Sequence, residues 1–337
     1  PAGDERQVAV SALNTEAQQI WGGEARAVSI PAGEVVEVPI TLEPIPIFAN
    51  VRDGSVVTNT RLRPAVVAPR GTTVAMLQAP ADGPWEVRVV DNRHPLATSE
   101  SSGLRGAHAL VVETRAHDLD LPDFTISHAH TLLRVIAARL DVLAARPGIA
   151  AVIAFRNRGR RAGSSQPHSH SQLIALDRVP SGIALRDARA QAHHARTTRA
   201  LLDDALRDEL GDGRRIVRDA DGIVTLCPYG SQRPHETWIV PRSRSTTLGA
   251  LPPAALEALA AALGDATWRL RAAGAGSDDN VLVHEPPVAS RAQPWGGTYI
   301  EIAPRTTTQA GLELASGACV LTLAPEEAAR ALRDTRP

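Results

Sequence analysis

The sequence feature that most constrains the fold is a polar segment rich in glycine and serine, residues 157–172, enclosed by two short apolar runs. The runs cover residues 149–155 and 173–176, and Pro147-Gly148 just before the first would end a preceding helix. Apolar runs of this length bounded by turn residues are typical of buried strands. The segment is therefore expected to be a loop that joins two buried strands and runs into the start of the second.

The end of this segment carries residues suited to phosphate chemistry. It reads His168-Ser169-His170-Ser171-Gln172. If these residues already form a strand, alternation places His168, His170 and Gln172 on one face. Backbone N–H groups of a glycine- and serine-rich loop can bind phosphate oxygens, and a neutral imidazole can attack phosphorus. The pattern therefore favours a site in which His170 acts on a phosphate.

Two simpler interpretations compete with this one. A bare His-x-His is more often a surface pair, or a metal-binding pair without chemistry. The neighbouring loop favours the phosphate interpretation, because it supplies further donors at Asn157, Gly163, Ser164 and Ser165. For the two serines, an ordinary Gly–Ser turn remains the alternative.

Composition excludes several classes of function. The net charge of −1 gives no overall field that would attract nucleic acid or a membrane. The chain contains no lysine, which excludes Schiff-base lysine chemistry and the lysine of a P-loop. Two cysteines are too few for a disulfide scaffold. With no apolar run long enough to cross a bilayer and no signal peptide pattern, a cytoplasmic protein without membrane or nucleic-acid partners is expected.

The order of the expected elements suggests a repeat. Strands and a helix that lead to the signature segment are followed by a second series of strands, helix and strands. This predicts an α+β fold of two pseudo-repeated halves, each an antiparallel sheet with helices packed on it. The expected strands cover residues 87–90, 109–113, 149–155, 223–227, 237–240, 281–284 and 299–302, and the expected helices 128–146, 186–210, 253–273 and 325–333. The predicted divisions are 1–80 (strands and loops), 81–197 (first half, with the site) and 198–337 (second half), with residues 168–172 corresponding to 297–301.

Five segments resemble the histidine-triad superfamily, specifically its galactose-1-phosphate uridylyltransferase branch. The Ser-bearing form of the motif is closer to ADP-glucose phosphorylase-like members than to the His-Pro-His-Gly-Gln of typical uridylyltransferases. The resemblance covers roughly residues 85 to 335, and residues 1 to about 80 match poorly. Besides 168–172, the matching segments are 85–96, 108–118, 227–241 and Ala310-Gly311-Leu312-Glu313-Leu314.

The resemblance implies a role for each matching residue. His170 would be the nucleophile that takes a nucleotidyl group from a donor and passes it on, and Gln172 would donate to the α-phosphate. Asn92 would lie near the nucleotide base, although an Asn in a turn is equally common for backbone reasons. Glu313 would contact the sugar of the second substrate. The family also implies a pseudo-duplication in which only the first half keeps the nucleophile.

The chain departs from the family at its metal ligands. Many members hold zinc with a Cys-x-x-Cys and two histidines; His117 and His168 match the histidines, but the chain has no Cys-x-x-Cys. The family's second metal uses a late His-x-His, and this chain reads Thr298-Tyr299-Ile300-Glu301 there. Structural zinc is normally four-coordinate. The sequence therefore predicts no metal cofactor, or at most a weak site at His117 and His168 completed by Asp or Glu.

Three hypotheses remain open. The leading one is a nucleotidyltransferase that moves an NMP group from a nucleoside diphosphate compound, such as a nucleotide sugar, to a phosphate-bearing acceptor through nucleotidyl-His170. A phosphorylase or hydrolase could use the same histidine. The non-enzyme alternative is a catalytically altered paralogue that only binds a nucleotide. A homodimer is an open possibility in each case.

Overall fold

The computed structural model describes residues 85–99 and 104–335, together with the backbone of five strands nearer the N-terminus. The chain divides into two compact units, Pro1–Pro69 and Arg70–Pro337. The first contains a three-stranded antiparallel sheet and a separate hairpin. These strands are β1 (Arg6–Leu13), β2 (Gln19–Val28), β3 (Glu43–Pro44), β4 (Ala49–Arg52) and β5 (Ser55–Thr58).

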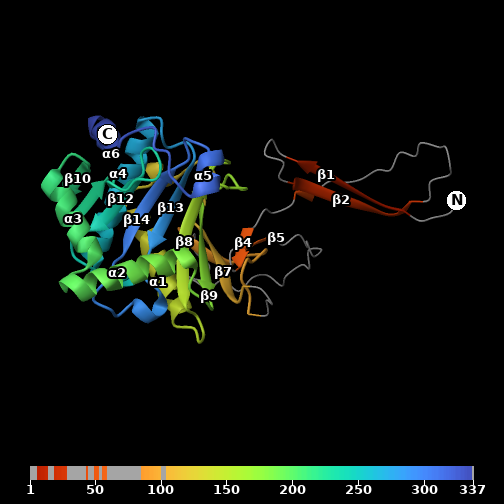
Figure 1. Cartoon of the computed structure of the whole chain (residues 1–337), viewed down its shortest axis with the longest axis horizontal. Coiled ribbons are helices and arrows are strands. Elements are labelled where there is room, and N and C mark those ends of the chain that lie inside the picture. The colour runs from red at the N-terminus through yellow and green to blue at the C-terminus, as the bar shows by residue number, and fades with distance from the viewer. Residues whose placement is uncertain are drawn as a thin grey trace. The chain divides into compact units, whose positions relative to one another are not determined.

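The second unit is built on one antiparallel sheet of nine strands (Figure 1). Its strands are β6 (Arg88–Asp91), β7 (Gly106–Val112), β8 (Ala151–Arg158), β9 (His170–Leu176), β10 (Ile216–Ala220), β11 (Ile223–Leu226), β12 (Thr237–Pro241), β13 (Asp279–His284) and β14 (Tyr299–Pro304). In the sheet they follow the order β10-β11-β12-β14-β13-β8-β9-β7-β6. The predicted α+β class is confirmed, and each predicted strand is present within a few residues.

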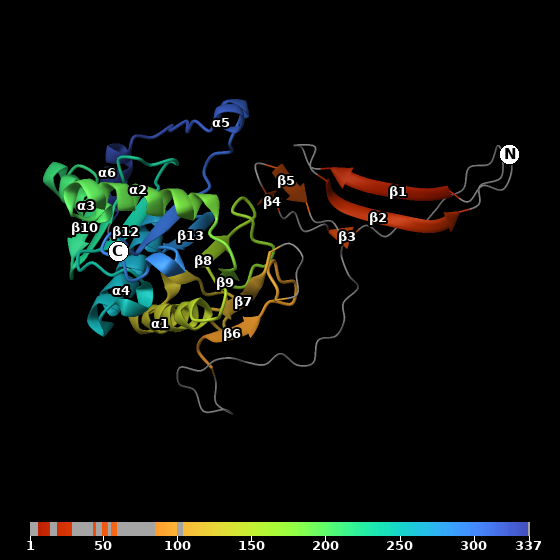
Figure 2. The same cartoon turned by 60° about the horizontal axis from the view of Figure 1, so that its bottom comes forward.

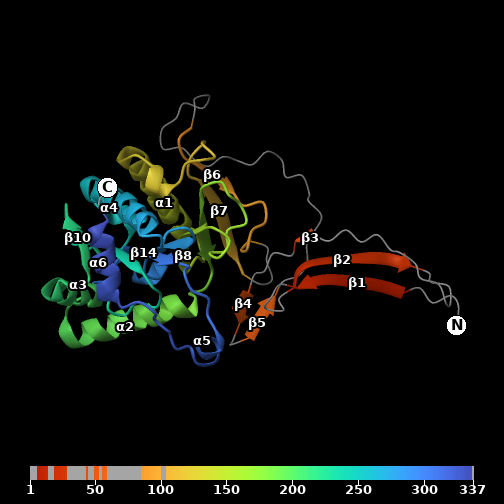
Figure 3. The same ribbon diagram turned by 90° about the horizontal axis from the view of Figure 1, so that it is seen from above.

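Helices cover both faces of this sheet. Helices α1 (Ile126–Ala144) and α4 (Pro253–Ala272) pack against each other on one face, where the main hydrophobic core lies. Figures 2 and 3 show α2 (Ser181–Thr197) and α3 (Leu201–Asp212) on the opposite side. Apolar side chains of α3, among them Leu202 and Leu206, pack on Val224 and Val240 of β11 and β12. The C-terminal part adds α5 (Gly311–Ser316) and α6 (Pro325–Asp334).

The single helix predicted over residues 186–210 is wrong. The chain forms two helices there, because Thr198 adopts a left-handed conformation with φ of 61° and ends α2. The side chain of Asp204 in α3 then accepts hydrogen bonds from His193, Arg199 and Arg207. This cluster of polar contacts fixes the turn between the helices, which hydrophobic periodicity alone does not reveal.

The two predicted halves form one continuous sheet and not two separate ones. Strands β6-β7-β9-β8 and β11-β12-β14-β13 have the same order, and the two groups meet where β8 pairs with β13. The halves, and the boundary between residues 197 and 198, stay predictions. Within the described residues, no helix is long and apolar enough to cross a membrane.

Candidate functional site

His170 is the first residue of β9, directly after the loop that leaves β8 at Arg158. Its Nδ1 lies 2.8 Å from the backbone oxygen of His168. A carbonyl oxygen only accepts, so Nδ1 must carry the proton and donate. The neutral ring therefore keeps the lone pair of Nε2, the nitrogen that can attack an electrophile.

Alternation along β9 places His170 and Gln172 on one face, as predicted. Leu173 and Ala175, of opposite parity to Gln172, lie in the main core under α1 and α4. His170 and Gln172 are half-buried and point to the other side of the sheet. Strand alternation fixes both residues because β9 pairs with β8 on one side and β7 on the other.

His168 precedes the first residue of β9, so its place on the face of His170 and Gln172 stays a prediction. Its Nε2 lies 2.7 Å from the backbone oxygen of Thr114, and its Nδ1 lies 3.0 Å from Nδ1 of His117. The two imidazoles are in contact with each other, and both line the pocket that His170 also lines.

A pocket of about 630 Å³ opens where β8 ends and β9 begins. It is large enough for a nucleotide-sized ligand. Predicted site residues that line it are His117, Asn157, Ser164, Ser165, His168 and His170, and neither Gly163 nor Gln172 is among the lining residues. Four arginines (156, 158, 160 and 271) and three aspartates (118, 120 and 123) also line it, and Arg158 and Arg271 form ion pairs with Asp120 and Asp123. In a chain without lysine, the charged donors available to a phosphate here are arginines.

Several donors of the loop form hydrogen bonds with acceptors of the same loop. The backbone N–H of Gly163 donates to the oxygen of Arg160, and that of Ser164 donates to the oxygen of Gly159. The hydroxyl of Ser164 donates to the backbone oxygen of Gln166 over 2.8 Å. These contacts form an ordered turn in which Gly163, with φ of 84°, occupies a conformation that favours glycine. Phosphate binding by Gly163, Ser164 and Ser165 stays a prediction.

Asn157 is oriented by a residue that sequence reasoning missed. Nδ2 of Asn280 donates both to the backbone oxygen of Ala162 and to Oδ1 of Asn157, each over 2.9 Å. Because Oδ1 of Asn157 is occupied in this way, its amide nitrogen is the end left to donate. Asn280 is opposite Asn157 where β13 pairs with β8, and that pairing cannot be read from one strand alone.

Asn92 and Gln172 both contact a buried histidine, His108. The Oε1 atom of Gln172 lies 2.9 Å from Nε2 of His108. The amide nitrogen of Asn92 lies 3.2 and 3.1 Å from the two ring nitrogens. Oδ1 of Asn92 accepts from the backbone N–H of His94, which is the local turn contact weighed as the alternative role for this residue.

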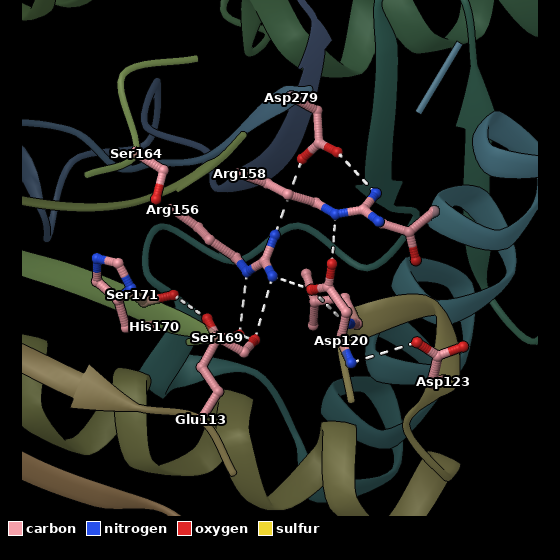
Figure 4. A network of polar contacts seen from close by, with 12 residues as sticks. Glu113, Asp120, Asp123, Arg156, Arg158, Ser164, Ser169, His170, Ser171 and Asp279 are labelled. Carbon is pink, nitrogen blue, oxygen red and sulfur yellow. Dashed lines mark hydrogen bonds and ion pairs between the residues drawn. The ribbon is translucent and has the colours of Figure 1, made fainter. Parts of the chain in front are cut away.

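The opposite face of the motif is anchored by a buried carboxylate (Figure 4). Glu113 has no exposed surface, and it accepts hydrogen bonds from the hydroxyls of Ser169 and Ser171 and from Nε of Arg156. The backbone N–H of Glu113 also donates to the oxygen of Ser169 over 3.1 Å. The two serines that distinguish this motif are therefore tethers that hold the start of β9 to the end of β7.

Arg156 links this anchor to further acidic residues. Figure 4 shows its guanidinium between Glu113 and Asp120, with Asp279 on the far side. Burial alone would lower the pKa of Arg156, but the three carboxyl groups raise it, so the side chain stays charged. Burial raises the pKa of Asp279 to about 6, against the opposing attraction of Arg156 and Arg158. The floor of the pocket is thus a buried ionic network.

The described residues do not fit a closed zinc site. His117 and His168 lie together, but no group of three possible ligands occurs in the part of the chain that the structure describes. At the position of the family's second metal, Nε2 of His284 lies 2.7 Å from Glu301, and Arg233 faces both Glu236 and Glu301. Hydrogen bonds and ion pairs therefore engage His284, Glu301 and Arg233 at this second position, whereas the buried hydroxyl of Thr298 has no hydrogen-bond partner. The absence of a metal stays a prediction.

Glu313 does not lie with the other predicted residues. It is at the start of α5, and its carboxylate accepts from the backbone N–H of Ala310 in the same turn. It does not line the pocket next to His170. A contact with the second substrate stays a prediction.

Comparisons with known proteins concern the family and the fold. Residues 92–180 match the family described as galactose-1-phosphate uridyl transferase, N-terminal domain, a range that includes Asn92, His108, Asn157, His170 and Gln172. The chain is a relative of the uridylyltransferases. The predicted resemblance to the branch that also includes ADP-glucose phosphorylases is confirmed.

Individual relatives are distant. An ADP-glucose phosphorylase of Arabidopsis thaliana is 24% identical over 280 residues, which cover 75% of each chain. A galactose-1-phosphate uridylyltransferase of Streptomyces lividans is 28% identical over 177 residues, so this chain spans about half of that protein, 49%. The structure of a galt-like protein from Arabidopsis thaliana superposes with a TM-score of 0.72 at 22% identity, covering 79% of this chain and 88% of that one. This last likeness concerns the fold.

Proposed function

We propose that this protein is a nucleotidyltransferase that moves an NMP group through a covalent intermediate on His170. The observation that carries the proposal is the hydrogen bond from Nδ1 of His170 to the oxygen of His168, at the rim of a pocket of about 630 Å³. This bond leaves Nε2 of the neutral ring as the nucleophilic atom. Burial and strand pairing hold the ring in place before substrate arrives.

The reaction would take place in two steps. In the first, the Nε2 lone pair attacks the α-phosphorus of a nucleoside diphosphate compound, a P–N bond forms, and the P–O bond to the leaving sugar phosphate breaks with its electron pair. The imidazolium formed in this way keeps its Nδ1 proton on the His168 carbonyl, which stabilises the positive charge. In the second, an oxygen of an acceptor phosphate attacks the same phosphorus, and the P–N electrons return to His170.

The class of donor follows from the pocket and the relatives. Arginines beside the loop suit a diphosphate, and the relative that covers three quarters of this chain is an ADP-glucose phosphorylase. That relative favours a phosphorylase, in which inorganic phosphate is the acceptor, as the second candidate. A hydrolase, or a paralogue that binds nucleotide without chemistry, would use the same pocket.

We further propose that the two halves of the nine-stranded sheet are a pseudo-duplication in which only the first half keeps a nucleophile. The pairing register of the strands supports this proposal. Gln172 pairs with Phe155 of β8, and Glu301 pairs with Leu282 of β13, while Phe155 and Leu282 pair with each other. The counterpart of His170 is then Tyr299, whose phenol does not replace an imidazole.

The test is mass spectrometry of the intact protein mixed with UDP-glucose, ADP-glucose or another nucleotide sugar. A mass increase of one NMP is expected with one donor, and none with His170→Ala. His194→Ala, which removes an imidazole from α2 instead, should form the adduct normally. A His170→Ala protein that still gains an NMP would refute the proposal, and so would a wild-type protein that gains none.

A further inference from the structure

We propose that His108 is a positioning residue that turns the amide nitrogen of Gln172 toward the substrate phosphate. The proposal rests on the proposed function, because the phosphate is that of the nucleotide donor. It assigns a role to a histidine of β7 that does not itself touch the pocket next to His170. A series of hydrogen bonds links the backbone to His108 and His108 to Gln172.

The first of these hydrogen bonds involves a backbone N–H group. The N–H of Leu96 lies 3.1 Å from Nδ1 of His108, and a backbone N–H can only donate. Nδ1 therefore accepts and carries no proton. A neutral imidazole must then hold its proton on Nε2.

The proton on Nε2 of His108 determines the orientation of the Gln172 amide. Nε2 of His108 is 2.9 Å from the side chain of Gln172, so the Nε2 proton must be donated to an acceptor. The acceptor end of the Gln172 amide is Oε1, and this end is held toward His108. The amide nitrogen, with two N–H donors, is left to donate on the face of β9 that His170 shares. In the reverse orientation an amide oxygen would face phosphate oxygens, which repel it.

The surroundings of His108 favour the neutral ring with its proton on Nε2. The residue is only 5% exposed, and burial lowers its pKa, although the hydrogen bond to Gln172 raises it. The ring therefore stays neutral near pH 7. His108 pairs with Ile174 in the β7–β9 ladder, so Gln172 is its diagonal neighbour on the same face. The amide nitrogen of Asn92 lies 3.2 Å from Nδ1 and 3.1 Å from Nε2, and with the proton on Nε2 only Nδ1 can accept from it.

Asn157 provides a parallel within the same site. Its oxygen is occupied by Asn280, as that of Gln172 is by His108, and in both cases the nitrogen end is left to donate. A site that must stabilise charge on non-bridging phosphate oxygens needs donors of this kind, fixed in advance.

Two variants of His108 separate positioning from support of the fold. In His108→Asn, the shorter side chain still reaches the N–H of Leu96 but not Gln172. His108→Gln is long enough to donate to Gln172. We expect His108→Asn to slow formation of the nucleotidyl adduct by about 10- to 100-fold, below the full loss of a preorganised donor. Donor affinity should change by less than about threefold, because the donor matters most where charge develops, and His108→Gln should recover much of the rate.

A double-mutant cycle with Gln172→Ala gives the decisive readout. If His108 acts through Gln172, His108→Asn should slow the Gln172→Ala enzyme by less than about twofold, because coupled residues are not additive. Nitrogen-15 NMR of the wild-type imidazole should show the proton on Nε2. A full additional slowing in the double mutant, or a proton on Nδ1, overturns the inference. Absence of any adduct in the wild-type protein would instead refute the proposed function, so the two failures are distinguishable.

Discussion

Replacement of Glu113 by Gln should destabilise the protein far more than any surface charge change, and this tests whether the two serines of the motif act as tethers. Glu113 is fully buried and accepts from Arg156, Ser169 and Ser171. Gln keeps the shape and one acceptor oxygen but removes the charge that faces the guanidinium. Its amide nitrogen would also meet groups that are themselves donors.

The expected loss of unfolding free energy depends on the partners that Arg156 keeps. Loss of one partner of a buried ion pair costs about 3–5 kcal/mol, because the other charge is left uncompensated. Arg156 keeps Asp120 and Asp279 as partners, which places this case at the low end. The serine hydroxyls can rotate to accept from the new amide, so they add little. We expect the free energy of unfolding to fall by about 3 kcal/mol.

Urea unfolding followed by tryptophan fluorescence measures this difference, with Asp208→Asn as the matched control. Asp208 forms an ion pair with Arg207, and both side chains are more than half exposed, at 74% and 58%. An exposed pair of this kind contributes about 0–1 kcal/mol. If Glu113→Gln lowers stability no more than Asp208→Asn does, the carboxylate is not the anchor of the motif.

Three further predictions concern the site. Gln172→Ala should slow adduct formation and breakdown by about 10²–10³-fold with little change in donor affinity, measured by rapid-quench kinetics; unchanged turnover with weaker binding would limit Gln172 to the ground state. Purified protein should hold well under one equivalent of zinc, and a chelator should leave its melting temperature unchanged; tightly bound stoichiometric zinc would refute this. Burial raises the pKa of Asp279 from 3.8 to about 6, so the folded state binds this proton more tightly, and the contribution of Asp279 to stability should fall as the pH rises from about 4 through 6. Asp279→Asn should remove that slope from unfolding measured between pH 4 and 7.5, and an unchanged slope would assign it to another group.

Much of the fold could be predicted because local sequence patterns indicate its helices and strands. The alternation that places His170 and Gln172 on one face is a property of any strand. β10 was missed, although a sign was present: Asp221-Gly222 is a hairpin turn signal, and Asp221 and Gly222 adopt φ of 56° and 76°. Its short, charged sequence is typical of an edge strand, which hydrophobic periodicity does not detect.

What could not be predicted depends on contacts between distant segments. From the sequence alone, His108 is one residue of a predicted strand. The pairing of β7 with β9 places it beside Gln172. Asn280 acquires its role only because β13 pairs with β8. β9 starts after His168, and this boundary could not be predicted because strand boundaries are set by partners more than by the strand's own sequence.

The alternation along β9 also explains why chemistry and anchorage can be adjacent without interfering. His170 and Gln172 face the side of the sheet proposed for the substrate, while Ser171 between them donates to Glu113 on the core side. A slip of one residue would exchange these roles, placing hydroxyls at the phosphate and an imidazole against a buried carboxylate. The register is therefore held from both sides, by β8 and by β7, and by a carboxylate that binds a serine on either side of His170. Substitutions on the core side should consequently act first on stability, and substitutions on the substrate side first on the rate of transfer.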